Sequence, residues 1–218
     1  EDRVFGNVGA LKNLKRKHPQ ILIALCGCMM EQEHIANKMY KSFPFVSLVF
    51  GTHSLHRFPQ LLYHTLADGK RVYERDNDDK KVYEGIPVKR DGTFKGWLSI
   101  MYGCNDFCTY CIVPYVRGRE ISRPVEEILH ELDVLTKYKV LDITLLGQNV
   151  NSYKSTYQGK EINFSTLLQI IVDHLKEINS TIGWVRFLSS NPKDFSDELI
   201  DVIAKNDIIC HHIALPVQ

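Results

Sequence analysis

Short apolar runs and amphipathic stretches alternate along the first part of the chain. Residues 21–25 are a continuous apolar run, which is typical of a strand buried in a parallel sheet. Residues 31–43 carry apolar side chains at helical spacing, residues 46–50 form a second strand-like run, and residues 59–66 predict a short helix. Strands that alternate with helices in this way indicate an α/β sheet.

The same alternation recurs in the second half of the chain. The predicted strands cover residues 97–101, 141–146, 184–188 and 212–215, and the predicted helices start near Pro124, cover residues 164–178 and start after an N-cap at Ser196. Repeated strand–helix units predict a parallel sheet, either doubly wound or a partial barrel. Right-handed crossovers would place the loops that follow these strands on one side of the sheet, where such folds carry their chemistry.

A charged stretch separates the two patterns. Residues 69–95 are rich in Lys, Arg, Asp and Glu, which is typical of a solvated linker, and we expect at most one strand there, at residues 81–83. The sequence therefore predicts one domain over residues 1–68 and a second over residues 96–218.

Composition narrows the class of protein. The chain has 218 residues, of which 44% are hydrophobic and 24% charged, as expected for a soluble globular protein. No apolar run approaches the length of a membrane span. The net charge of +1 gives no overall signal for nucleic acid, so any RNA contact must come from local patches or from further parts of the protein. Six cysteines without a secretory segment indicate a reducing compartment, hence the cytoplasm.

Three cysteines on one predicted loop carry the strongest chemical signal. Cys104, Cys108 and Cys111 stand in the run GCNDFCTYC, with the spacing C-x3-C-x2-C. Three thiolates on one loop can bind three irons of a 4Fe–4S cluster and leave the fourth iron open to a small ligand. A disulfide framework does not suit a chain of this size and compartment. Structural zinc needs four ligands, and no C-x2-C partner pair follows, although zinc stays open as an alternative.

This spacing, with an aromatic residue before the third cysteine, resembles the signature of the radical S-adenosylmethionine (SAM) enzymes. Several further runs resemble the methylthiotransferases of that superfamily, so that the resemblance covers nearly the whole chain. These runs are residues 108–124 (CTYCIVPYVRGREISRP), 145–153 (LLGQNVNSY), 186–192 (RFLSSNP) and 215–218 (LPVQ), and upstream residues 27–29 (GCM) and 50–53 (FGTH).

The resemblance implies a reaction and a substrate. It is strongest to the tRNA branch of the family, which adds a methylthio group at C2 of N6-dimethylallyladenosine in the anticodon loop. Methylthiotransferases that act on threonylcarbamoyladenosine in tRNA or on a ribosomal protein, and other radical SAM enzymes, stay open as alternatives. So does a non-catalytic iron–sulfur electron carrier. Implied partners are the tRNA and an electron donor such as flavodoxin, the sulfur donor is undetermined, and a monomer is expected.

The resemblance also implies a fold and a set of site residues. The fold is α/β: the C-terminal part of a flavodoxin-like methylthiotransferase domain, followed by the first half of a radical SAM partial (β/α) barrel. Cys104, Cys108 and Cys111 would hold the 4Fe–4S cluster that binds SAM. The residues expected to contact the cofactor or the substrate are Tyr110, Gln148, Asn149, Ser190 and Gln218.

A second 4Fe–4S cluster is implied at Cys28. The family holds this cluster with three cysteines, and only Cys28 matches; the other two would precede Glu1, so we expect the chain to be a fragment. The neighbouring Cys26 is expected to be a buried thiol at the end of a strand, because its side chain alternates away from those beside it.

Overall fold

The structure is a computed structural model, and it describes residues 1–75, 83–85 and 94–216. The chain forms two compact units, one made of Glu1–Tyr83 with Tyr115–Arg117, the other of Glu84–Pro114 and Gly118–Gln218. In the described part of the chain, none of the helices combines the length and apolarity needed to cross a membrane.

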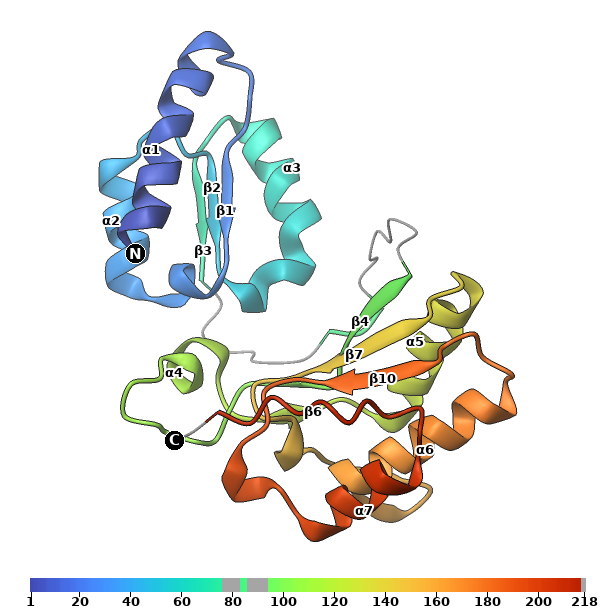
Figure 1. Cartoon of the computed structure of the whole chain (residues 1–218). Coiled ribbons are helices and arrows are strands. Elements are labelled where there is room, and N and C mark those ends of the chain that lie inside the picture. The colour runs from blue at the N-terminus through green and yellow to red at the C-terminus, as the bar shows by residue number, and fades with distance from the viewer. Residues whose placement is uncertain (76–82, 86–93, 217–218) are drawn as a thin grey trace. The chain divides into compact units, whose positions relative to one another are not determined.

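The first unit is a small α/β structure built on a parallel sheet (Figure 1). Its elements are α1 (Asp2–Lys17), β1 (Ala24–Cys26), the 3-10 helix η1 (Cys28–Glu31), α2 (Glu33–Ser42), β2 (Leu48–Phe50), the 3-10 helix η2 (Thr52–Arg57), α3 (Phe58–Asp68) and β3 (Val72–Glu74). The strands lie in the order β1-β2-β3, with α1 and α2 on one face and α3 on the other. Alternation along β2 explains both layers, because Val49 packs beside Met39 of α2 while Leu48 and Phe50 pack beside Leu61 of α3.

The strand β3 lies near the start of the stretch that was expected to be a linker, so this part of the expectation is wrong. Val72–Glu74 pairs in parallel with β2, from Leu48 opposite Val72 to Phe50 opposite Glu74. A strand within a charged stretch is stabilised by its neighbour in the sheet rather than by its own apolar pattern. Of the strand expected at residues 81–83, residues 81 and 82 lie outside the described residues, and Tyr83 is not in a strand.

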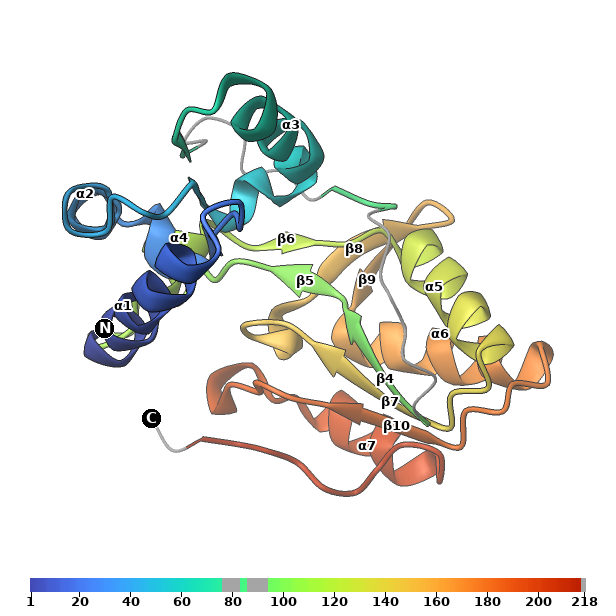
Figure 2. The ribbon, with the colours of Figure 1, turned by 90° about the horizontal axis from the view of Figure 1, so that it is seen from above.

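The second unit contains another three-stranded parallel sheet, in the order β10-β7-β4 (Figure 2). Its elements are β4 (Lys95–Ser99), β5 (Met101–Tyr102), the start of α4 (Val113–Arg117, of which residues 115–117 belong to the first unit), β6 (Ile121–Ser122), α5 (Val125–Lys137), β7 (Asp142–Leu146), η3 (Val150–Ser152), β8 (Lys154–Tyr157), β9 (Lys160–Asn163), α6 (Phe164–Glu177), β10 (Trp184–Phe187), η4 (Pro192–Asp194) and α7 (Asp197–Lys205). Helices α5, α6 and α7 lie on one side of this sheet and share one apolar core with it. Trp97 of β4 and Trp184 of β10 are about half exposed, and each is followed along its strand by a buried residue.

Most of the predicted elements in this unit are confirmed, including the N-cap. The hydroxyl Oγ of Ser196 accepts a hydrogen bond from the backbone N–H of Leu199 at 3.2 Å. The strand predicted at residues 212–215 is wrong: residues 212–216 have no regular structure, and it is the preceding Ile209 that forms an isolated parallel bridge with Val185 of β10.

A hairpin that the sequence did not predict lies between β7 and α6. Its strands β8 and β9 are antiparallel and are joined by Gln158 and Gly159, both with positive φ, 50° and 77°. Two successive residues with positive φ give the turn geometry that suits the twist of a tight hairpin. Because glutamine rarely occupies such a turn position, the sequence around Gln158 did not indicate a hairpin.

One buried arginine joins several segments of the second unit. The guanidinium of Arg123 is in hydrogen-bonding contact with both carboxylate oxygens of Glu84, at 2.7 and 2.6 Å, and with Glu131 at 2.9 Å, and it also donates to the carbonyl of Ser99. Its side chain is only 6% exposed. The backbone carbonyl of Arg123 accepts from the hydroxyl of the buried Tyr153 at 2.7 Å. This cluster ties the segment before β4 to helix α5 and to the end of the sheet.

We predict that Arg123→Ala lowers the free energy of unfolding by about 3 kcal/mol, because it leaves partly buried carboxylates without their cation. Urea unfolding followed by tryptophan fluorescence measures this, since both tryptophans, Trp97 and Trp184, belong to the second unit. The matched control is Lys205→Ala, which removes an exposed ion pair with Asp201 and should cost less than about 1 kcal/mol. Equal losses in the two variants would contradict this assignment.

Candidate active site

The cysteine loop, residues 103–112, follows the carboxyl end of β4 by way of the short strand β5. β5 pairs with β6, so the chain leaves the sheet and returns to it beside the same strand end. Gly103 begins the loop with φ of 71°, and a Cβ there would overlap the backbone carbonyl of Arg119. The N–H of Cys104 donates to the carbonyl of Gly118 at 3.1 Å. Glycine is therefore required at this position by both its φ and the close approach of the returning chain.

The structure places the three loop cysteines within one short loop. Cys104 is buried, whereas Cys108 and Cys111 are half-buried, and the N–H of Cys111 donates to the carbonyl of Cys108 at 2.9 Å in a tight turn. Tyr110, between the two, is 78% exposed. Burial raises the pKa of the Cys104 thiol; a backbone hydrogen bond from Asp106 opposes this shift, and nearby acidic side chains add to it. Ligation by such a thiol releases its proton to the solvent.

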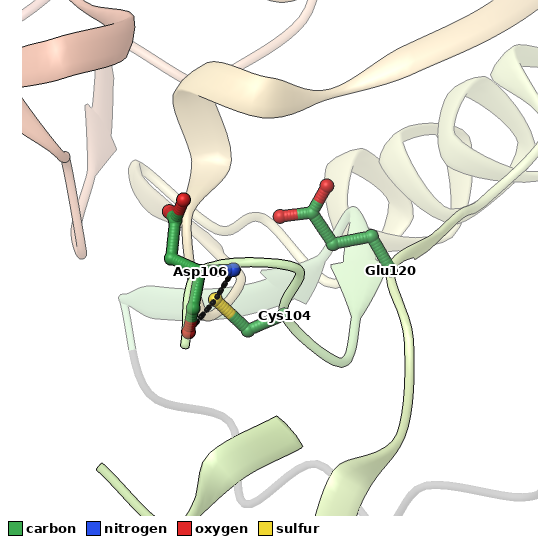
Figure 3. Close-up of side chains that lie close together, drawn as sticks. All are labelled: Cys104, Asp106 and Glu120. Atoms are coloured by element: carbon green, nitrogen blue, oxygen red, sulfur yellow. Dashed lines mark hydrogen bonds between the residues drawn. The ribbon is translucent and has the colours of Figure 1, made fainter. Parts of the chain in front are cut away.

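Two carboxylates lie beside the first cysteine (Figure 3). Ligand atoms of Cys104, Asp106 and Glu120 are all within 4.8 Å of one another. The backbone N–H of Asp106 points to the sulfur of Cys104 at 3.4 Å. Both carboxylates already accept hydrogen bonds from side chains of this unit, which include Asn149 and Ser152. Neither carboxylate was predicted as a site residue from the sequence; the one available signal was the acidic residue between the first two cysteines.

The loops after β7 and β10 contain the other predicted site residues of this unit. Asn149 and Ser190 are 2% and 4% exposed, and the loops are joined by a backbone hydrogen bond from the N–H of Val150 to the carbonyl of Ser189 at 3.2 Å. Ser189 has a left-handed backbone with φ of 65°, a strained conformation for serine that is often found at functional sites.

Four polar atoms in these loops are buried and have no hydrogen-bond partner among the described residues. They are Gln148 Oε1, Asn149 Oδ1, Asn151 Nδ2 and Ser190 Oγ. Buried polar groups are normally paired, so this cluster at one end of the sheet is suited to a polar ligand. The atoms offer two amide acceptors, one amide donor and one hydroxyl, which fits the amino-acid and ribose groups of SAM. Gln218 lies outside the described residues.

Cys28 belongs to the first unit and starts η1, directly after Gly27, whose φ is 140°. It therefore lies past the end of β1, as expected. The expectation for Cys26 is wrong, because the residue is exposed rather than buried. Its position explains the difference: β1 ends there, and Cys26 Sγ lies 3.9 Å from the carbonyl of Gly51. Partial shielding of the sulfur and the charge of Glu31 still raise the pKa of this thiol.

Comparison with curated proteins gives three informative relatives. Each carries the name tRNA-2-methylthio-N(6)-dimethylallyladenosine synthase, and each alignment covers 100% of this chain. The enzymes of Clostridium perfringens, Clostridium tetani and Bacillus pumilus are 47%, 49% and 45% identical to it. The aligned region is 47%, 47% and 42% of their lengths, so the chain spans about half the length of the curated relatives it matches.

A solved structure shares the fold. The radical SAM methyltransferase TsrM of Kitasatospora setae, determined with tryptophan and a SAM analogue, matches with a TM-score of 0.54 and 13% identity, over 95% of this chain and 50% of its own. At that identity the likeness concerns the fold alone.

The family model of the radical SAM superfamily matches residues 98–218, more than half of the chain and the whole region from β4 through the cysteine loop to the strand-end loops. Enzymes of this superfamily use a 4Fe–4S cluster and SAM, and the three thiols on one loop together with the buried unpaired polar atoms fit those two groups. The chain belongs to the radical SAM superfamily.

Proposed function

We propose that this chain is part of a tRNA methylthiotransferase that adds a methylthio group at C2 of N6-dimethylallyladenosine in the anticodon loop. The observation that carries the proposal is the full-chain identity of 45–49% to the synthases named above. A loop with three cysteines at the carboxyl edge of a parallel sheet supplies the chemistry that such a reaction needs.

In this proposal, Cys104, Cys108 and Cys111 hold the cluster through their thiolates. With SAM bound, the cluster supplies the electron that cleaves SAM reductively and so starts hydrogen abstraction from the substrate carbon. The protein's part is to hold the loop and exclude water: Cys104 is buried, and Gly103 lets the returning chain close over it.

The unpaired polar atoms of Gln148, Asn149 and Ser190 contact SAM or the target nucleoside in this proposal. Tyr110 and Gln218 are proposed to do the same. The exposed ring of Tyr110 is available to stack on a base or on the SAM adenine. A base in a single-stranded loop can be turned out of its stack to reach such a site.

We further propose that the second unit is the first half of a radical SAM partial barrel and that the first is the C-terminal part of a flavodoxin-like domain. Helices on one side of β10-β7-β4 support the barrel, and helices on both faces of β1-β2-β3 support the flavodoxin-like domain. The proposed domain limits are residues 1–68 and 96–218 with a linker between them, of which β3 joins the sheet of the first domain. The first domain would carry a second cluster on Cys28 as its one ligand from this chain. The enzyme would act as a monomer in the cytoplasm with an electron donor such as flavodoxin.

Nucleoside mass spectrometry of tRNA tests the substrate. We predict that deletion of the full-length gene removes 2-methylthio-N6-dimethylallyladenosine and leaves N6-dimethylallyladenosine to accumulate. The full-length gene should restore the product, and the same gene with Cys108→Ala should not, because a cluster ligand is lost. Loss of the 2-methylthio derivative of threonylcarbamoyladenosine instead, or no change in any nucleoside, would contradict the proposal.

Iron analysis of the full-length protein tests the second cluster. We predict that Cys28→Ala loses roughly four irons per chain and the sulfur-insertion step, and that it retains SAM cleavage at the other cluster. Cys26→Ala is the matched control, because Cys26 and Cys28 both adjoin Gly27. This variant should keep all its iron, since Cys26 is the last residue of β1 whereas Cys28 lies beyond the end of that strand. Iron loss in Cys26→Ala alone would reverse the ligand assignment.

A further inference from the structure

The side chain of Asp106, between the first two loop cysteines, joins the cysteine loop to both neighbouring strand-end loops. Asp106 Oδ2 accepts hydrogen bonds from Nδ2 of Asn149, in the loop after β7, and from Nδ2 of Asn191, in the loop after β10, each at 3.0 Å. Asp106 Oδ1 lies 3.6 Å from the ammonium of Lys193. These contacts all lie within the second unit.

The donors of this carboxylate are themselves held in place. Asn191 Oδ1 accepts from the backbone N–H of Lys193 at 3.1 Å, and the N–H of Asn191 donates to Asn151 Oδ1 at 3.0 Å. Asn149 is 2% exposed, and its Nδ2 is shared with Asp194 Oδ2 at 2.6 Å. Because the amide nitrogen of Asn149 faces two carboxylates, its oxygen, which has no partner among the described residues, is turned away from them.

A second residue between these cysteines, Asn105, provides another attachment. Its amide exchanges two hydrogen bonds with Glu120, one to the carboxylate at 3.2 Å and one from the backbone N–H at 3.3 Å. Glu120 also accepts from the hydroxyl of Ser152 at 2.8 Å. Asn105 is exposed, whereas the side chain of Asp106 is 19% exposed. Hydrogen bonds to a shielded carboxylate are the stronger kind, so the Asp106 contacts dominate.

We propose that Asp106 is a positioning residue that fixes the first half of the cysteine loop to the loops after β7 and β10, so that the loop that would hold the cluster stays beside the residues that would bind SAM. The proposal rests on the proposed function, in which the three cysteines bind the cluster. It also divides the role of Asn149 between its two amide atoms: the nitrogen holds the loop, and the oxygen is left for the ligand.

The test uses the full-length protein with Asp106→Ala and the matched control Asp194→Ala, which removes the other acceptor of Asn149 without touching the cysteine loop. Hydrogen exchange of the loop amides is measured in the protein without cluster. SAM affinity is measured after reconstitution, from the change in the electron paramagnetic resonance spectrum of the reduced cluster on SAM addition. Asp106→Asn is included because it keeps one acceptor oxygen and the side-chain shape.

We expect Asp106→Ala to speed exchange of the loop amides and to weaken SAM binding, each by roughly tenfold or more, with unchanged iron content. Asp194→Ala should leave the exchange of the loop amides at the wild-type rate, because Asp106 keeps both of its asparagine donors, and Asp106→Asn should lie between. Unchanged exchange and SAM affinity in Asp106→Ala would overturn the proposal while leaving the cluster in place. If the wild type itself takes up no cluster on the triplet, the proposed function fails, and the exchange comparison still decides whether Asp106 holds the loop.

Discussion

The parallel register of β4, β7 and β10 is the constraint on which the site depends. Because the strands point the same way, the cysteine loop, the loop after β7 and the loop after β10 all emerge at one edge of the sheet. Their polar side chains then have each other as partners, and a single carboxylate, Asp106, accepts from both neighbouring loops. The sheet brings the loops to one edge, and side-chain hydrogen bonds set their relative positions.

Helices α5, α6 and α7 pack on one face of this sheet and support the edge from which the loops emerge. Leu132, Leu168 and Leu199, from three successive helices, are at most 1% exposed and belong to one apolar core. Burial of this kind supplies most of the stability of a domain. The ion pairs of Arg123 with Glu84 and Glu131 add polar contacts at one end of this sheet. A site made of short loops is therefore supported on elements that move little.

Apolar periodicity predicted the strands and helices whose stability comes from their own buried face. It failed where long-range pairing decides the structure: β3 lies in a charged stretch and forms because β2 is beside it, and residues 213–215 are apolar yet form no strand. The spacing of Cys104, Cys108 and Cys111 singled out the loop and predicts its chemistry. The contacts of Asp106 and Glu120 are made with partners far away in the sequence, such as Asn191 and Ser152, so the residues beside the cysteines could not predict those contacts.

Binding of a 4Fe–4S cluster by the loop triplet is measured by the iron content and the electron paramagnetic resonance spectrum of the anaerobically reconstituted full-length protein. Cys108→Ala should lose roughly four irons per chain and the spectral change that SAM causes. Cys210→Ala is the control, a half-buried thiol beside Arg186 in the same unit, and should retain both. Full iron content and an unchanged response to SAM in Cys108→Ala would contradict the account.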